Sequence, residues 1–503
     1  MGWLLSAAFH AMLILGATLV FIEQLWPFDG PTGIACGLSL PLPQVPEIER
    51  PRDVFERSGL IPDDGWAFEP AMDSAFTYGQ PKEGAPRGGD EGQDLSSASW
   101  SLGSSATPGM SAGSGPQRAA EWKTLGFRSR GCGISRISSR CRYPCTDSAV
   151  TASLRWLARH QNSDGSWSSD GYNRHCVQAS CAGAGDREFD EGVTSLALLA
   201  FLGAGYSQLS RDVLADPAFP DRPIAMGETV KKGLQWLLSR QDAEGAVGAR
   251  GSKFMYNHAI ATLALSEAYG LTASAVLQAP AQAALDFLAA ARNPGAGWRY
   301  AVRGGENDTS VTGWAVMALK SAELSGLTFP RAAATDAVAW IEKATEPGPS
   351  PRVGYTQAGS GKVYIPGRNE QFDDHPTMSA VGLLSRILIR KDRRDAGLAA
   401  ALVADLPVWK ENRIDFYAWY YSSLALFQFD GPAGPCWKKW SQPAKDTLVL
   451  QQKLAKSGCE NGSWDPSVDR WGSEGGRVYA TAINTLTLEI YYRYAAVFGG
   501  NRN

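Results

Sequence analysis

Two helical segments of different character, at 150–167 and 190–205, decide the fold. They read VTASLRWLARHQNSDGSW and DEGVTSLALLAFLGAG. The first segment ends in a glycine-containing turn with a tryptophan, whereas the second begins with an acidic cap and continues in apolar and small residues. A helix that is apolar nearly all round is buried on every side. The pair therefore predicts a helical hairpin with its second helix buried inside the domain.

The same pair recurs along the rest of the chain. Segments of the first kind begin at 230, 281, 332, 395 and 446, and segments of the second kind begin at 256, 308, 373, 415 and 476. The first kind is amphipathic, with charged faces such as Lys231, Lys232 and Arg240. Self-similar hairpins of this length indicate a repeat architecture. We expect an all-α domain, an (α/α)6 toroid of about six helical hairpins whose second helices form the inner ring. An open solenoid of the same hairpins is the alternative.

The N-terminal part has a different character. Residues 3–22 carry no formal charge. A run of this length is long enough to span a bilayer as a helix. No Lys or Arg precedes this run, so a membrane anchor fits better than a cleavable signal peptide. We predict a transmembrane anchor over 1–24, with the bilayer as its partner. A Pro-, Gly- and Ser-rich flexible linker over 25–121 and the helical domain over 122–503 would follow.

Charge and cysteine content narrow the functional classes. The net charge is -3, from 48 basic and 51 acidic residues, and no basic patch indicates a nucleic-acid partner. None of the eight cysteines falls in a Cys-x-x-Cys pair, so the close spacing typical of zinc ligands is missing. Disulfides in an oxidising compartment fit the cysteines better, with free structural thiols as the alternative. We therefore expect the C-terminal domain to be extracytoplasmic, and we assign neither metal ligands nor a cofactor.

One segment carries a family resemblance. Residues 161–167, QNSDGSW, match the Q-x3-G-x-W repeat of squalene-hopene and oxidosqualene cyclases, in which Gln caps helix ends and ties outer helices together. The copy at 241–247 lacks the Trp, the copy ending at Trp298 lacks the Gln, and the copy ending at Trp464 keeps only Gly and Trp. Residues 145–495 thus resemble one barrel of the two-barrel hopene cyclases. They also resemble bacterial membrane-anchored proteins with prenyltransferase and squalene oxidase repeats. The resemblance implies a toroid and an apolar, isoprenoid-like ligand.

The catalytic signatures of the related enzymes are altered. Class II cyclases carry D-x-D-D, but Gln371 stands in place of the first Asp. The adjacent Asp373 and Asp374 could raise the pKa of one carboxyl and supply a general acid, with His375 relaying the proton. A helix cap at Asp374 is the other interpretation. Protein prenyltransferases bind zinc through a D-F-Y-H-type segment, and Ala418 replaces that His, so the resemblance gives no zinc site here.

The residues that open the inner helices form the candidate binding site. If all inner helices begin at the same end of the ring, these residues line one cavity that combines aromatic and polar groups. In the alternative interpretation, the aromatic residues fill the barrel and the aspartates only cap helices. The ligand-binding candidates are Asp190, His258, Asp308, Asp415, Tyr417, Trp419, Tyr420, Arg477 and Tyr479.

Three functions remain open on these residues. The first is a membrane-anchored toroid that binds an apolar or isoprenoid ligand, or a partner, without catalysis. The second is an isoprenoid cyclase with a variant acid motif. The third is a carbohydrate-active (α/α)6 enzyme, which would need two carboxylates about 5–10 Å apart. The altered signatures favour the first function, and the sequence leaves open whether the protein is an enzyme.

Overall fold

The computed structural model describes residues 144–491, except 177–179, 349–350, 361–375, 391–394 and 455–457. In this part the chain forms twelve α-helices, three short 3-10 helices and one two-stranded antiparallel hairpin. The prediction of an all-α domain is therefore confirmed for the described residues. The predicted anchor, the predicted linker and residues 122–143 lie outside them. Among the helices that the structure describes, none is both long and apolar enough to cross a membrane.

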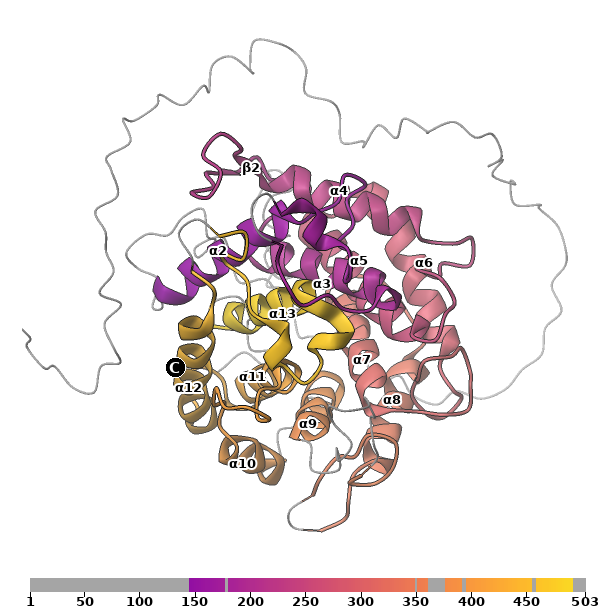
Figure 1. Ribbon diagram of the computed structural model, residues 1–503. Coiled ribbons are helices and arrows are strands. Elements are labelled where there is room, and N and C mark those ends of the chain that lie inside the picture. Colours follow the sequence, from indigo (N-terminus) through magenta and orange to yellow (C-terminus); the bar gives the residue numbers. More distant parts are fainter. Residues whose placement is uncertain are drawn as a thin grey trace, which may run out of the picture. The chain divides into compact units, whose positions relative to one another are not determined.

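The helices alternate between two sets, as the repeats predict (Figure 1). The inner set consists of α3 (Asp190–Gly203), α5 (Phe254–Thr272), α7 (Thr309–Leu324), α9 (Pro376–Arg390), α11 (Phe416–Asp430) and α13 (Gly472–Glu489). The outer set consists of α2 (Pro144–Arg159), α4 (Met226–Ser239), α6 (Ala275–Ala291), α8 (Arg331–Lys343), α10 (Ala396–Ala404) and α12 (Pro435–Gln451). The short elements are η3 (Tyr172–His175), η4 (Arg187–Phe189), β1 (Val213–Leu214), β2 (Ile224–Ala225) and η5 (Pro466–Val468).

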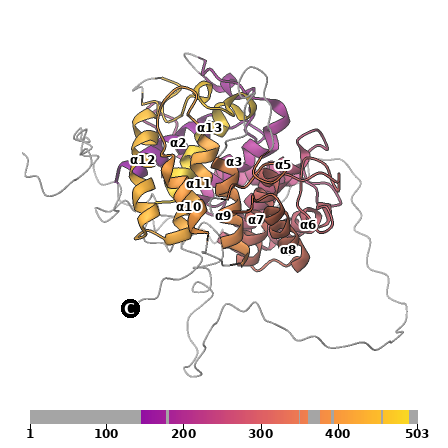
Figure 2. The ribbon, with the colours of Figure 1, turned by 90° about the horizontal axis from the view of Figure 1, so that it is seen from below.

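The inner helices contact one another in a closed order. Helix α3 packs against α5, and the contacts continue through α7, α9 and α11 to α13, which packs against α3. The outer helices α2 and α12 also touch, so both sets join the first hairpin to the last (Figure 2). We call this junction of α2, α3, α12 and α13 the seam.

Burial separates the two sets for a physical reason. Every residue of α7 from Thr309 to Ala322 is buried, whereas α4 buries one face and exposes the other. Small residues let the inner helices approach closely. A Cβ atom on Gly313 of α7 would lie 2.4 Å from the Cγ1 atom of Val381 in α9, closer than side-chain atoms pack. The predicted assignment of inner and outer helices therefore matches the burial of the described residues.

Glutamine side chains bond consecutive outer helices to each other. Gln161 donates its side-chain amide to the carbonyl of Thr229 in α4 at 2.9 Å, and Gln241 donates to the carbonyl of Pro280 in α6 at 3.0 Å. Each of these glutamines also donates to the glycine carbonyl of its own turn. A backbone carbonyl has two lone pairs, so one inside a helix can accept this amide in addition to its intrahelical bond. These two repeat glutamines thus tie α2 to α4 and α4 to α6.

The repeat glycine and tryptophan hold the turn in place. Gly165 has φ of +95°, and a Cβ atom there would lie 2.1 Å from the carbonyl oxygen of Lys232 in α4. Only glycine fits a left-handed backbone conformation at such close approach. The indole of Trp167 donates to the carbonyl of Leu157 at 2.7 Å, and Trp298 and Trp464 make the same kind of bond to their own outer helices.

Four aspartates were predicted as helix caps: two form caps, one does not, and Asp374 lies outside the described residues. Asp308 and Asp415 precede α7 and α11, and their side chains accept hydrogen bonds from the backbone N–H groups of Val311 and Ala418. Asp190 is the first residue of α3 rather than its cap. Its carboxylate instead accepts the backbone N–H of Ser169 at 2.8 Å, so it anchors the loop before the helix.

Candidate functional site

The beginnings of α7 and α11 bring several candidate residues together with Tyr256 of α5. The hydroxyl groups of Tyr417 and Ser310 lie 2.8 Å apart and join α11 to α7. The indole of Trp314 donates to the hydroxyl of Tyr256 in α5 at 3.1 Å and stacks on Tyr420 with ring centroids 6.0 Å apart. We call the following side chains, which touch one another, the aromatic cluster: Tyr256, Trp314, Tyr417, Tyr420 and Tyr421.

Asp308 lies beside this cluster as a fully buried carboxyl group. Burial raises its pKa to about 7, against the hydrogen bond from the Val311 N–H and the charge of Arg299, which both lower it. Its second oxygen accepts the hydroxyl of Tyr355 at 3.2 Å, and that hydroxyl lies 2.8 Å from the hydroxyl of Tyr300. The three side chains form a chain of hydrogen bonds that leads from the buried carboxyl to Tyr300, which is partly exposed. The members of such a chain polarise one another.

Asp415 shares its surroundings with a second carboxyl group. Asp469 is buried and accepts the backbone N–H of Phe416 at 2.8 Å and that of Trp471 at 3.0 Å. Burial, with the charge of Asp415 second, raises the pKa of Asp469 to about 8, and burial also raises the pKa of Asp415. Two buried carboxyl groups that interact this closely hold a proton between them near neutral pH. The sequence analysis did not select Asp469, because it lies in a loop that no motif marks.

Tyr479 extends the site to α13. Its side chain is buried near Asp415, Asp469 and Tyr256, and burial raises its pKa well above the usual value. Among the described residues its hydroxyl has no hydrogen-bond partner. A buried polar group without a partner costs free energy unless water or a ligand satisfies it. Tyr421 of the aromatic cluster also has a buried hydroxyl without a described partner.

Four other candidates make structural contacts elsewhere. His258 accepts the Val247 N–H and bonds the Ala284 carbonyl, and burial lowers its pKa to about 4. Asp190 binds the loop before α3, as described above. Trp419 packs on Trp409 and Phe416. Arg477 is buried and bonds two loops at the seam. Asp373, Asp374 and His375 lie outside the described residues.

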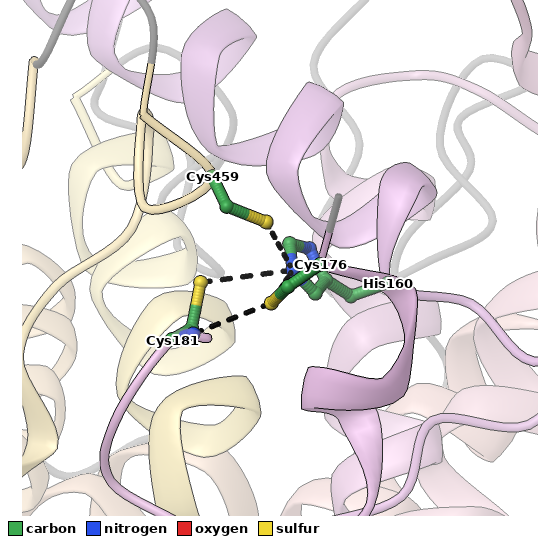
Figure 3. Close-up of side chains that lie close together, drawn as sticks. All are labelled: His160, Cys176, Cys181 and Cys459. Atoms are coloured by element: carbon green, nitrogen blue, oxygen red, sulfur yellow. Dashed lines mark hydrogen bonds between the residues drawn. The ribbon is translucent and has the colours of Figure 1, made fainter. Parts of the chain in front are cut away.

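The cysteines differ from the expectation of disulfides. Cys176, Cys181, Cys436 and Cys459 are free thiols, so the expected disulfides are wrong for these four residues. Three of them gather around the ring of His160, as Figure 3 shows. Since the proposed extracytoplasmic location rested on disulfides, these four cysteines no longer support it. Cys36, Cys132, Cys141 and the side chain of Cys145 lie outside the described part.

Comparisons with known proteins add distant structural likenesses. No family model matches this sequence, and no curated protein matches it. A solved structure, the crystal structure of a protein from Actinoplanes, is similar over 69% of this chain and 98% of that chain. The identity is 14% and the TM-score is 0.42.

Proposed function

We propose that this chain is a membrane-anchored (α/α)6 toroid that binds an uncharged, largely apolar molecule of the isoprenoid kind. The closed order of contacts among the inner helices supports a ring rather than an open solenoid. The apolar run at 3–22 supports the anchor, which would place the ring near a membrane that holds such molecules.

The observation that carries the proposal is the pairing of the aromatic cluster with carboxyl groups that hold protons near neutral pH. Asp308, with its pKa raised to about 7, and the pair of Asp415 and Asp469 stand beside tyrosines that are neutral at this pH. The site therefore combines aromatic faces with hydrogen-bonding groups of little charge. Aromatic walls with few polar groups are the usual composition of a site for an apolar ligand.

The position of the basic residues argues against a prenyl diphosphate. A diphosphate would need several cationic groups, which bind phosphate oxygens through charge-assisted hydrogen bonds. Arg477 is 1% exposed and its guanidinium is held by Glu460, Ser463 and a backbone carbonyl at the seam. Arg299 is paired with the carboxylate of Glu306 at 2.5 Å, so its charge already has a partner. We therefore favour a neutral isoprenoid, such as an alcohol or a hydrocarbon.

Binding without catalysis is the leading proposal because the acid motif of the cyclases is altered at Gln371. A second candidate, acid-catalysed cyclisation, is favoured by one specific observation. Asp308 is a buried carboxyl with its pKa raised to about 7 and with a hydroxyl relay through Tyr355 to Tyr300. A general acid works best when its pKa is close to the working pH. In this second proposal Asp308, rather than the pair at 373–374, would donate the proton.

Binding of three matched probes tests the leading proposal. The full-length protein in detergent would be mixed with geranylgeraniol, squalene or geranylgeranyl diphosphate, and bound ligand would be measured after rapid gel filtration. We expect the alcohol and the hydrocarbon to bind and the diphosphate to bind more weakly. Tighter binding of the diphosphate, or binding of none of the three, would contradict the proposal.

Two buried tyrosines provide a matched pair of variants. Tyr479→Phe removes one of the unpartnered hydroxyls at the site, and Tyr206→Phe removes a buried hydroxyl without a described partner outside the site, near the end of α3. A single hydrogen bond contributes about 0.5–1.5 kcal/mol, so Tyr479→Phe should weaken geranylgeraniol binding about 2- to 13-fold. Squalene has no polar group and should bind the Tyr479→Phe protein unchanged. Equal effects of both variants would place the ligand elsewhere.

A further inference from the structure

We propose that His160, Cys176, Cys181 and Cys459 form a structural zinc site that fastens the first helical hairpin to the last. The four side chains come from three separate segments. His160 follows α2, Cys176 and Cys181 lie on the loop after η3, and Cys459 lies between α12 and α13 (Figure 3). Their ligand atoms all lie within 4.8 Å of one another. This site is independent of the proposed ligand site.

The distances fit a tetrahedral metal. The Nε2 atom of His160 lies 3.3 Å from the sulfur of Cys459, 3.6 Å from that of Cys176 and 3.8 Å from that of Cys181. At the usual zinc–sulfur and zinc–nitrogen bond lengths, neighbouring ligand atoms of a tetrahedral site lie about 3.6 Å apart. The three observed distances are centred on this value.

The histidine is held in the tautomer that a metal needs. The Nδ1 atom of His160 lies 2.8 Å from the carbonyl oxygen of Trp156, to which it donates its proton. The Nε2 atom, which faces the sulfurs, then carries the lone pair. The ring is also stacked on Trp156 with centroids 4.1 Å apart. A metal-bound histidine typically donates its other ring N–H to a backbone carbonyl in this way.

Arg477 holds together two of the loops that carry the cysteines. Its Nε atom donates to the carbonyl of Ala182 at 2.8 Å, next to Cys181. Its other guanidinium nitrogens reach Ser463 at 3.1 Å and Glu460 at 3.0 Å, next to Cys459. Arg477 is therefore a positioning residue for this site.

The donor set indicates zinc in a structural role. Three thiolates and one imidazole in a tetrahedron are a typical set for zinc, and four protein ligands leave no position for a substrate. His160, Cys181 and Cys459 are buried, and Cys176 is partly exposed and offers a path for the ion. On binding, zinc would displace the protons of the three thiols.

The location explains why a ring would need such a link. The contact between His160 and Cys459 spans 299 positions of the sequence and crosses the seam, where the two ends of the repeat array meet. Elsewhere in the ring, neighbouring hairpins directly follow one another along the chain. At the seam they are joined by side-chain contacts and by a few backbone hydrogen bonds, such as that from the Arg477 N–H to the Gly183 carbonyl at 3.0 Å. The zinc site would add a strong link to these.

Metal analysis of the full-length protein tests the proposal. The chain would be expressed with added zinc, purified in detergent with a reductant, and measured by elemental mass spectrometry. We expect about one zinc per chain. Exchange for cobalt should produce the visible and near-ultraviolet absorption of tetrahedral cobalt with thiolate ligands. Wild-type protein without bound metal, or with two of these cysteines joined in a disulfide after reductive purification, would overturn the proposal.

Variants assign the metal to these residues. Cys459→Ser should reduce bound zinc at least tenfold, whereas Cys436→Ser, a free cysteine of α12 outside the group, should leave it unchanged. If Cys459→Ser fails to fold, Cys459→His keeps a metal-binding side chain and should retain zinc while it shifts the cobalt spectrum. Unchanged zinc in Cys459→Ser would place the metal elsewhere and overturn the assignment.

Discussion

Gln452, which follows α12, donates its side-chain amide to the carbonyl of Ala149 in α2 at 2.8 Å. It thereby makes across the seam the same bond that Gln161 and Gln241 make between consecutive outer helices. Gln452 is buried and also donates to the carbonyl of Gly462 at 2.9 Å. The last outer helix is thus bonded to the first, and a glutamine contact of the repeat type is present at the seam.

Replacing Gln452 should weaken the seam. Gln452→Ala leaves the buried carbonyls of Ala149 and Gly462 without this donor, at a cost of about 1–3 kcal/mol in the free energy of unfolding. Gln282→Ala is the control, since its bond to the Thr328 carbonyl is exposed, and it should cost less than about 0.5 kcal/mol. Urea unfolding followed by circular dichroism measures both values. Equal losses of unfolding free energy in the two variants would show that the seam contact stabilises the protein no more than an exposed bond does.

Two glycines with the same backbone conformation allow the cost of a steric clash to be distinguished from the cost of left-handed backbone strain. Gly165 and Gly205 have φ of +95° and +91°, but an added Cβ meets the Lys232 carbonyl at 2.1 Å in the first case and no atom within 4 Å in the second. Gly205→Ala should therefore cost only the left-handed strain, about 1 kcal/mol. Gly165→Ala should cost at least about 1 kcal/mol more, because α4 must move. Thermal unfolding of the two variants gives the comparison, and a difference near zero would contradict the close approach.

Asp308 should make stability depend on pH. Its pKa is about 7 in the folded protein and 3.8 ordinarily, so between these values the folded state holds a proton that the unfolded state has released. This stabilisation is complete below pH 3.8 and is lost as the pH rises, by up to about 1.4 kcal/mol per pH unit until about pH 7. In the Asp308→Asn protein this side chain is neutral at every pH, so the variant should not show this loss of stability as the pH rises.

The difference between the two proteins isolates that one group. Unfolding by urea at several pH values should show wild type losing stability relative to Asp308→Asn as the pH rises from about 4 to about 7, because other titrating groups cancel in the comparison. A difference that does not change with pH would mean that Asp308 is ionised in the folded state.

The sequence was sufficient for the parts of the fold that repeat locally. Periodic apolar residues distinguished buried from half-exposed helices, and Gln161 and Gln241 were recognised because each stands four residues before its turn glycine. Asp308 and Asp415 were predicted as caps because each directly precedes an apolar run. Asp190 has the same local pattern, but its carboxylate bonds the Ser169 N–H, a contact that only the folded loop creates.

Other features depend on residues that meet only in three dimensions. Gln452 lies ten residues before Gly462, because the loop that carries Cys459 lengthens this copy of the repeat. The four-residue spacing between Gln and Gly is therefore absent, and Gln452 was not recognised. The group of cysteines around His160 was not predicted either. Spacing along the chain does not reveal ligands that come from the first and last hairpins. Asp469 became a candidate only through its position beside Asp415. Long-range placement, rather than local preference, determines all three features.

The most direct test of the proposed function is to identify what the protein carries. The full-length chain would be purified from membranes in mild detergent, and bound molecules would be extracted and identified by mass spectrometry, with Tyr479→Phe as the matched variant. The account predicts a neutral isoprenoid, unchanged in structure, that is retained by wild type and reduced in the variant. A bound prenyl diphosphate or sugar, or a cyclised product that disappears in Asp308→Asn, would contradict a binding toroid for neutral isoprenoids.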